Sequence, residues 1–425
     1  MPLLVEVDER MNTRRLYRAP PAARDNGGTG AIVIGAPPIG LAIVRSLGRS
    51  GVPVCVLRGG DHRVAATSRF SCFSAAWPSG DEGRQVECLV ELATKRNLRR
   101  WTLYPTDDET AAFLGRQYDL LSELFLVASP PWSVLRWAYD KRMTYGLAAD
   151  LGVAFPTTYY PRTRDDVARL DCTFPVILKP AAKPRKNRFT EAKAWRAEDR
   201  DSLKRGYEEA CTLVPPDLVM VQELIPGGGE TQFSYAALCE DGRPLAVLVA
   251  RRTRQYPTDF GRASSFVETV DERAIEEPAR RLLEALRLTG IVEIEFKRDP
   301  RDGTHKLLDI NARAWAWQAL GAPAGVDFPY LLWRLLHGDR TPPLRASMAV
   351  RWIRPAADIP AALAEIAAGR LTLTAYLRSL HRPLVSAIFA WDDPLPAILE
   401  APFFAPIMYR RLLGGRTDAE RRSRR

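Results

Sequence analysis

The most informative stretch of this chain is GIVEIEFKRDPRDGTHKLLDINARAW, residues 290–315. Its first part alternates apolar with charged side chains, which is typical of a β-strand with two unlike faces. A turn rich in Asp, Pro and Gly follows, and the second part alternates in the same way. The sequence therefore predicts a β-hairpin that brings four polar side chains toward one surface: Glu295, Asp309, Asn311 and Arg313.

The polar face of this hairpin suits a divalent cation. Two carboxylates and an amide oxygen, without thiols or imidazoles, are hard oxygen ligands that favour Mg²⁺ over zinc, and magnesium usually arrives with phosphates. Arg313 cannot ligate a metal, but its planar guanidinium can hold a carboxylate or a phosphoryl group through two hydrogen bonds. Taken alone, the face is equally compatible with a surface ladder of cross-strand ion pairs.

Two upstream lysines are candidate phosphate contacts. Lys179 ends the apolar strand of FPVILKP, where an ammonium group is costly unless an anion meets it. Lys141 lies near the start of an earlier helix, and an exposed helical lysine is by itself more often only solvated. The interpretation of Lys141 therefore depends on the other motifs.

The stretch VQELIPGGGE, residues 221–230, combines an apolar strand with a glycine-rich turn. The strand leads into Gln222 and Glu223, and Glu230 follows the turn. Backbone N–H and C=O groups at such a place can bind the edge of an adenine, and a carboxylate a few residues later can reach ribose hydroxyls. In isolation the stretch is also compatible with an ordinary turn.

Residues 31–60 predict the opening of a parallel βαβ unit. Gly35 and Gly40 allow a tight turn at the start of a helix, where N–H groups attract anions. The glycines do not form a complete GxGxxG motif and no acidic residue ends the second strand, so we interpret the unit as a structural lobe rather than a dinucleotide site. Residues Thr106 to Glu109 are interpreted as helix caps, in a kind of loop that also contacts ligands in α/β proteins.

The composition places the chain among globular proteins. At 425 residues with 46% hydrophobic content, it can bury several cores and should divide into two to four lobes. The six cysteines form no CxxC pair, which favours reduced thiols in a cytosol over structural zinc. No apolar run reaches the roughly 20 residues of a membrane helix, and the first residues lack the apolar core of a secretory signal. We therefore expect a cytoplasmic protein without a transmembrane segment.

The net charge is +10, from 61 Lys and Arg against 51 Asp and Glu. An excess of this sign suits an anionic ligand, nucleic acid or an acidic membrane surface. Part of it lies in RRLLGGRTDAERRSRR, residues 410–425, which we interpret as a solvated end, and we expect no nucleic-acid partner. A second basic cluster follows FPVILKP and is harder to dismiss: Lys183, Arg185, Lys186 and Arg188.

The order of these motifs resembles the ATP-grasp superfamily and, within it, the bacterial carboxylate–amine ligases that include D-aspartate ligase-like proteins. The resemblance runs from about Ala31 to Leu336. It is carried by RSLGRSGVPV, YPTDDE, DKRMTYGLAADLGVAFP, FPVILKP, VQELIPGGGE, RQYPTDFG and IEFK followed by LDINAR. The pair IEFK and LDINAR is the most specific of these motifs for the superfamily. The full set in this order is stronger evidence for the resemblance than any single motif.

The resemblance implies a role for each motif. Lys141 and Lys179 would contact ATP phosphates, Gln222, Glu223, Leu224 and Ile225 would form the adenine hinge, and Glu230 would bind ribose. The magnesium ligands would be Glu295, Asp309 and Asn311, a set that also admits Mn²⁺. The residues implied in catalysis are Arg313, Lys179 and Arg254.

The sequence departs from the family pattern at some of these positions. Asp309 stands where many relatives have Glu, which shortens the ligand by one methylene. Relatives usually carry a glycine-rich lid after the second lysine, whereas AAKPRKNRFTEAKAW has no glycine. Arg252 or Arg254 could stabilise phosphates or a substrate carboxylate, and a basic strand edge without such a role is an equally good interpretation of both.

The resemblance also implies an ATP-grasp fold of α/β and α+β lobes with a Rossmann-like N-terminal lobe. We predict a flexible arm at 1–29, a Rossmann-like domain at 30–130, an ATP-grasp domain at 131–338, and an appended subdomain with a basic tail at 339–425. The implied activity is ligation of a small-molecule carboxylate to an amine through an acyl phosphate, releasing ADP and phosphate. A kinase or carboxylase with another acceptor and an ATP-binding regulatory protein without turnover are the alternatives, and a homodimer stays open.

Overall fold

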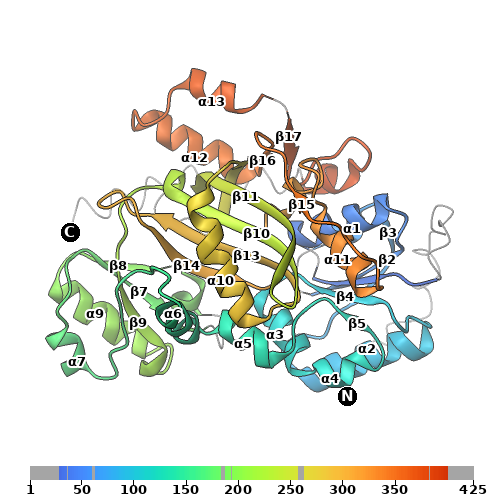
Figure 1. The fold of residues 1–425 in the computed structure, drawn as a ribbon, viewed down its shortest axis with the longest axis horizontal. Helices are drawn as coiled ribbons and strands as arrows, with labels where there is room; N and C mark the ends of the chain where they lie inside the picture. Colours follow the sequence, from blue (N-terminus) through green and yellow to red (C-terminus); the bar gives the residue numbers. More distant parts are fainter. Residues whose placement is uncertain are drawn as a thin grey trace, which may run out of the picture.

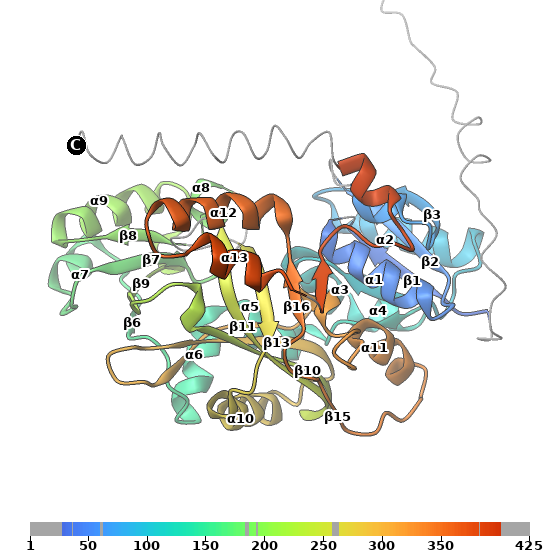
Figure 2. The same ribbon diagram turned by 90° about the horizontal axis from the view of Figure 1, so that it is seen from above.

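The computed structural model describes residues 28–35, 37–59, 63–182, 187–192, 194–256, 263–381 and 383–400. Residues 1–27 of the predicted arm and residues 401–425 of the predicted tail lie outside this part of the chain. Figures 1 and 2 show a central sheet, drawn in yellow and orange, between a blue N-terminal lobe and a green lobe. None of the helices in the described ranges is both long and apolar enough to span a bilayer.

The N-terminal lobe is a five-stranded parallel sheet in the order β3-β2-β1-β4-β5. The run AIVI forms the central strand, and alternate side chains enter two different cores, so both faces of the sheet are covered. The strands are β1 (Ala31–Ile34), β2 (Val54–Arg58), β3 (Ser71–Ala76), β4 (Thr102–Pro105) and β5 (Leu126–Val127). The helices are α1 (Pro38–Arg49), α2 (Glu82–Lys95), α3 (Asp108–Arg116) and α4 (Tyr118–Ser122), with a 3₁₀ turn η1 (Val64–Thr67). The predicted parallel βαβ opening is confirmed.

Two loops at the carboxyl ends of β1 and β4 touch each other. Gly35 has a φ of +101°, and a Cβ there would lie 2.1 Å from Thr106 Oγ1, so only glycine fits. The Thr106 hydroxyl donates to the carbonyl of Ile34 at 2.8 Å. Asp107 accepts the N–H of Thr110 and caps α3 as predicted.

The green lobe is a small four-stranded sheet in the order β6-β9-β7-β8. Its core is separate from the others and is built on Val176, Leu178, Val219 and Val221. The strands are β6 (Thr158–Tyr159), β7 (Val176–Pro180), β8 (Trp195–Ala197) and β9 (Val219–Glu223). The helices are α7 (Arg164–Arg169), α8 (Arg188–Glu191) and α9 (Arg200–Cys211), with η2 (Pro216–Leu218). Helices α5 (Trp132–Tyr139) and α6 (Lys141–Asp150) precede this lobe in the chain.

The central sheet has eight strands, seven of them in the order β14-β13-β10-β11-β12-β16-β17, while β15 pairs with β11. The predicted hairpin is confirmed, because β13 pairs antiparallel with β14. The strands are β10 (Gln232–Glu240), β11 (Arg243–Tyr256), β12 (Ala263–Thr269), β13 (Gly290–Arg298), β14 (His305–Asn311), β15 (Leu344–Arg345), β16 (Arg351–Ile353) and β17 (Leu384–Ser386). The remaining elements are η3 (Gly229–Thr231), η4 (Arg273–Ile275), α10 (Glu276–Leu286), η5 (Gln318–Leu320), α11 (Phe328–Leu336), α12 (Pro355–Ala367) and α13 (Leu373–Ser379).

One face of the central sheet changes from apolar to polar along its strands. On β10, Ala236 and Leu238 belong to the core shared with the N-terminal lobe, whereas Gln232 and Ser234 point the same way earlier in the strand. On β13, Ile291 belongs to the same core, and Glu293 and Glu295 continue that face. The opposite face packs into a second core to which α5, α6 and α10 contribute. The N-terminal lobe therefore covers half of this face and leaves the polar half beside it.

The C-terminal stretch, which the sequence presents as an appended subdomain, is built into the central sheet. Strands β15, β16 and β17 all pair within it. The stretch then returns to the N-terminal lobe, where Asp393 is fully buried. The Asp393 carboxylate accepts from Arg45 Nε at 2.9 Å and from the Ser68 hydroxyl at 2.6 Å. Residues 344–393 therefore connect the sheet with the first lobe.

We predict that Asp393→Asn lowers the melting temperature by several degrees. Removing one charge of a buried pair costs about 3–5 kcal/mol, because the partner, here Arg45, is left buried without its counter-ion. Thermal unfolding followed by circular dichroism measures the effect. Asp392→Asn is the matched control, since Asp392 pairs with Arg49 at the surface and such pairs contribute about 1 kcal/mol at most. Equal melting temperatures for the two variants would contradict this account.

Candidate functional site

The candidate site begins where β13 and β14 place their acidic side chains opposite each other. Glu295 lies across from Asp309, and Glu293 lies across from Asn311. Glu295 is 8% exposed and accepts from Gln232 Nε2 at 3.2 Å. The hairpin thus brings together the three side chains that the sequence predicts as magnesium ligands.

Glu293 joins this group, although the sequence analysis did not select it. Its carboxylate is 3% exposed and accepts from the Ser234 hydroxyl at 2.9 Å and from Trp317 Nε1 at 3.1 Å. Asn311 Nδ2 donates to Glu293 and to Glu295, at 3.3 Å each. Burial, and then the neighbouring charge of Glu295, raise the pKa of Glu293. The signal was present in the sequence, because Glu293 and Glu295 alternate on one strand face.

Positive side chains from other elements compensate these acids. Lys141, the first residue of α6, forms an ion pair with Asp309. Arg252 of β11 is 7% exposed and lies 3.4 Å from the Glu295 carboxylate. Two of the three predicted metal ligands are therefore paired with cations in this state of the protein.

Arg313 connects the site with the N-terminal lobe. Its Nε donates to the Asp108 carboxylate at the start of α3, and a second guanidinium nitrogen donates to Asn311 Oδ1 at 3.3 Å. Burial alone would lower the pKa of Arg313, but the carboxylates of Asp108, Glu293 and Asp107 together raise it above its usual value. Asp108 therefore does more than complement a helix dipole, because it holds a predicted catalytic cation across a lobe boundary.

The predicted hinge lies at the end of β9. Lys179 of β7 donates through Nζ to Gln222 Oε1 at 3.0 Å, and Gln222 Nε2 donates to Thr158 at 2.8 Å. Glu223 accepts from Lys306 at 2.6 Å and from Arg301 at 3.2 Å, which ties the hinge to the hairpin. The lysine expected to contact phosphate and the hinge thus belong to one hydrogen-bonded unit.

The glycine-rich turn follows this unit. Ile225 is buried, and the carbonyl of Gly227 accepts from Lys297 at 2.7 Å. Glu230, predicted to bind ribose, is exposed and accepts the N–H of Gly228 at 2.9 Å. In this state the Glu230 carboxylate stabilises its own turn. To bind a ribose hydroxyl through the same oxygen, it would have to break its hydrogen bond with the Gly228 N–H.

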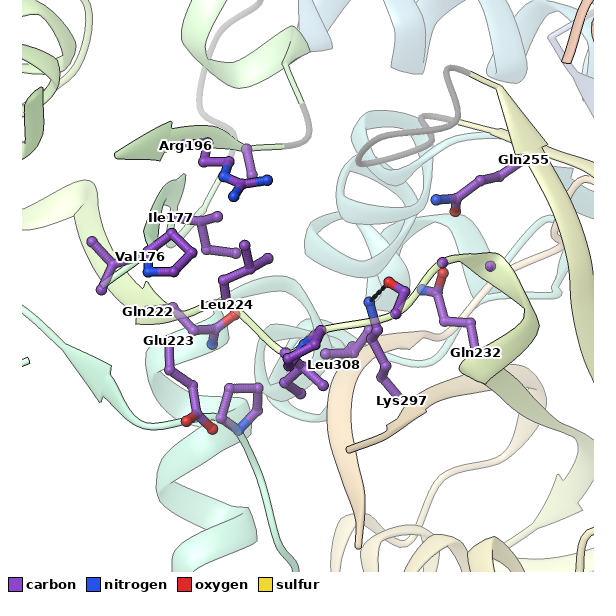
Figure 3. A pocket seen from close by; sticks show the side chains of 18 of the residues that line it. Val176, Ile177, Arg196, Gln222, Glu223, Leu224, Gln232, Gln255, Lys297 and Leu308 are labelled. Carbon is purple, nitrogen blue, oxygen red and sulfur yellow. Dashed lines mark hydrogen bonds between the residues drawn. The ribbon is translucent and has the colours of Figure 1, made fainter. Parts of the chain in front are cut away.

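A cavity of about 1220 Å³ opens beside the hinge (Figure 3). It is lined by predicted residues Lys179, Gln222, Glu223, Leu224, Ile225, Glu230 and Arg254. Lys141, Glu295, Asp309, Asn311 and Arg313 are not among its lining residues. The predicted site residues therefore form two groups. The hinge group lines this cavity, and the acidic group, Glu295, Asp309 and Asn311, lies on the sheet with the cations Lys141 and Arg313 beside it. Gln232 joins the two groups, because it lines the cavity and also donates to Glu295.

The C-terminal helices form an unforeseen wall of this cavity. Ala361 and Glu365 of α12 line it, together with Arg370 and Leu371, which follow that helix. Figure 2 shows α12 and α13 extending between the green lobe and the blue lobe above the central sheet. No motif in the sequence indicated that residues beyond 338 would reach this cavity.

Arg254, predicted as catalytic, has contacts of a different kind. Its guanidinium donates to both carboxylate oxygens of Asp358 in α12, at 2.8 and 2.9 Å, and to Ser379 at 3.1 Å. It also lies 4.0 Å from the ring centroid of Phe266 and 5.1 Å from that of Tyr376. Asp358 is fully buried. We therefore propose that Arg254 holds the C-terminal helices against β11 instead of meeting a substrate.

Part of the predicted basic surface lies outside the described residues. Lys183, Arg185 and Lys186 lie outside the described residues, and so do residues 257–261 of the RQYPTDFG motif. Arg188 is described and pairs with Glu209 at 3.0 Å.

The acidic group fits a magnesium ion that is shared with phosphates. Its ligands are all oxygen, and Mg²⁺ commonly takes one or two carboxylates and completes its shell with phosphate oxygens and water. Among the described residues, no group of three or more His, Cys, Asp or Glu side chains is placed to hold a metal ion by itself. Asn311 would have to turn its amide, because Nδ2 now faces the carboxylates.

The chain is similar to known proteins in sequence and in fold. Residues 216–356 match a family model described as ATP-grasp in the biosynthetic pathway with Ter operon. D-aspartate ligase of Enterococcus faecium (strain Aus0004) is 26% identical over 245 residues, which cover 54% of this chain and 57% of that ligase. The chain thus matches little more than half the length of this relative.

Two solved structures share the fold. The L-amino acid ligase from Bacillus licheniformis superposes with a TM-score of 0.56 at 15% identity, covering 72% of this chain and 74% of that one. The biotin carboxylase domain dimer of Hydrogenobacter thermophilus 2-oxoglutarate carboxylase was solved with MgADP, ADP and bicarbonate. It has a TM-score of 0.60 at 14% identity, covering 76% and 73%.

The chain therefore has an ATP-grasp fold, and its residues 216–356 match the family model for ATP-grasp domains in the biosynthetic pathway with the Ter operon. The relatives named above include two ligases whose names specify amino acids.

We predict that Arg254→Met destabilises the protein by about 3–5 kcal/mol, because Asp358 is left buried without its counter-ion. The double variant Arg254→Met/Asp358→Leu should recover part of this loss, since both charges are then removed. Thermal unfolding of the single and double variants measures the coupling.

The control is Lys95→Met, which removes an exposed pair with Glu91 and should change stability by about 0.5 kcal/mol or less. An Arg254→Met protein that melts like the wild type but has lost ATP turnover would contradict the structural role and restore the catalytic one.

Proposed function

We propose that this chain is an ATP-dependent carboxylate–amine ligase. The observation that carries the proposal is the meeting of Glu295, Asp309 and Asn311 with Lys141 and Arg313 on one sheet face, next to a cavity bordered by the hinge. Oxygen ligands and cations in one place suit a magnesium-bound triphosphate. The family match and the two amino acid ligases support this activity.

In the proposed complex, the hinge binds the adenosine part of ATP. Leu224 and Ile225 follow β9 at the cavity wall, where their backbone groups can meet an adenine edge and their side chains can cover its face. Lys179 sits beside Gln222 at the same wall, so a phosphate oxygen can replace the Gln222 amide as the acceptor of its Nζ proton. A negative ligand is a better partner than an amide oxygen, which favours this exchange.

Magnesium, held by Glu295, Asp309 and Asn311, would neutralise charge on the β- and γ-phosphates. The protein itself supplies Lys141 and Arg313 on either side of these ligands. When a triphosphate enters, Lys141 can leave Asp309 for a phosphate oxygen, so Asp309 then becomes available to the cation. The same exchange makes binding of metal and nucleotide mutually dependent.

The proposed chemistry has two steps. A carboxylate oxygen of the first substrate attacks the γ-phosphorus, the bond to the β–γ bridging oxygen breaks, and ADP leaves with those electrons. The nitrogen of the amine then attacks the carbonyl carbon of the acyl phosphate, the carbon–oxygen bond breaks, and phosphate leaves while the nitrogen loses a proton. Arg313 and Lys141 stabilise the charge that develops on the transferred group.

We further propose that one substrate is an amino acid. Arg313 and Asp108 already pair a guanidinium with a carboxylate across the lobe boundary. A zwitterion can insert between such a pair, because its carboxylate suits Arg313 and its ammonium group suits Asp108. The names of the D-aspartate ligase and the L-amino acid ligase agree with this substrate class.

The proposal is tested by ADP and phosphate release with MgATP and pools of amino acids and other carboxylates, each with and without amines. We expect release to require both substrates and to yield an amide that mass spectrometry detects. Asp309→Ala should reduce the rate at least about 100-fold, while Asp392→Asn, a surface carboxylate, should not. A stable phosphorylated product or dependence on bicarbonate would instead show a kinase or carboxylase. Tight MgATP binding without turnover in any pool would favour a regulatory protein.

A second prediction concerns the Lys141–Asp309 pair. In Lys141→Met, Asp309 loses its cation, so Mg²⁺ should bind about tenfold more tightly in the absence of nucleotide, while ATP should bind about tenfold more weakly. Calorimetric titration with Mg²⁺ and with a non-hydrolysable ATP analogue measures both affinities, and Mn²⁺ tests the second predicted metal. Lys95→Met is the control. Unchanged Mg²⁺ affinity in Lys141→Met would contradict the assignment of Asp309 as a ligand.

A further inference from the structure

The hairpin of β13 and β14 contacts the hinge stretch at two places, one on either side of the hinge. Lys306 of β14 donates to the Glu223 carboxylate at 2.6 Å. Lys297 of β13 donates to the carbonyl of Gly227 at 2.7 Å (Figure 3). Residues 224–226, which include the backbone proposed to meet adenine, therefore lie between two points that the hairpin holds.

These two lysines lie directly opposite each other across the hairpin. Like charges in such a position repel each other and lower the stability of the strand pair. The Lys306 ammonium is compensated by Glu223 and by Asp299, whose carboxylate lies 3.1 Å from it. The Lys297 ammonium donates instead to the Gly227 carbonyl. The hairpin thus contains an unfavourable pair of cations, and the acceptors of this pair include both ends of the hinge.

Asp299 organises the cations at the Glu223 end. Its carboxylate is buried and accepts from Arg301 Nε at 2.8 Å. The hydrogen bonds from Arg301 lower the pKa of Asp299, against the effect of burial, so the carboxylate stays ionised. Arg301 also donates to Glu223 at 3.2 Å. Two cations that share a buried carboxylate, Arg301 and Lys306, therefore hold the hinge glutamate.

The same two strands carry the acidic group. Lys297 lies two residues beyond Glu295 on the same face of β13, which is about 7 Å along the strand. On β14, Lys306 precedes Asp309 by three residues. The spacing between the hinge and the proposed metal ligands is therefore set within a single hairpin.

We propose that Lys297 and Lys306 are positioning residues of the nucleotide site. They hold the hinge at the distance from Glu295 and Asp309 at which one ATP molecule meets both the hinge and the metal ligands. This inference rests on the proposed function, because it takes the hinge as the adenosine site. A merely structural link between the lobes would use the same contacts, but its loss would not distinguish between ligands with and without adenosine.

The test compares two ligands of the full chain in calorimetric titrations with Mg²⁺: a non-hydrolysable ATP analogue, and tripolyphosphate, which has no adenosine. Lys306→Met and Lys297→Met should each bind the ATP analogue about tenfold more weakly, since each loses a hydrogen bond from a charged group. Both should bind tripolyphosphate like the wild type. Lys306→Arg should restore binding of the ATP analogue to within about threefold, because a guanidinium can donate to Glu223 and to Asp299. Lys95→Met, which changes an exposed lysine of α2, is the control and should bind both ligands normally.

Equal weakening of both ligands in the two methionine variants would overturn the inference, because it would show a general loss of the folded site. Binding of the ATP analogue as in the wild type would overturn it as well. If the wild type binds tripolyphosphate as tightly as the ATP analogue, the hinge does not bind adenosine, and the nucleotide assignment fails together with the inference. A wild-type preference for the ATP analogue that the variants lose, without amide formation in any substrate pool, would support the inference and contradict the ligase activity.

Discussion

The structure depends on the pairing of β13 with β14, which places Glu295 opposite Asp309 on a half-buried sheet face. Acids so close together repel each other unless cations or hydrogen bonds compensate them. Lys141 and Arg252 supply the charges from two other elements. The positions of α6 and β11 are therefore tied to the same acidic group that the proposed function requires for magnesium and phosphate.

The sequence predicted the part of this arrangement that rests on local patterns. Alternation of apolar and charged residues specified the hairpin, and the order of motifs specified the class of fold. The surroundings of Glu293 could not be predicted from local patterns, because its partners Ser234 and Trp317 lie 59 and 24 residues away. An alternating glutamate on a strand gives no sign of which partners will cover it.

The contacts of Arg254 could not be predicted from the sequence either. The resemblance of its segment to a family segment suggested a catalytic cation, whereas its partner Asp358 lies 104 residues further along the chain. Strands of two or three residues, such as β15 and β16, carry too few positions for a periodic pattern. The link between the C-terminal stretch, the central sheet and the cavity wall was therefore visible only in three dimensions. Through Asp393 the same stretch also contacts Arg45 of the N-terminal lobe. The C-terminal stretch therefore contacts the central sheet, the cavity and the N-terminal lobe.

The central claim is that a substrate carboxylate becomes an acyl phosphate before an amine attacks it. Phosphorus NMR of the phosphate released from a substrate labelled with oxygen-18 in its carboxylate tests this directly. The account predicts one labelled oxygen in each phosphate, because the carboxylate oxygen that attacks phosphorus leaves with it. Phosphate without label, released together with an amide product, would contradict the account.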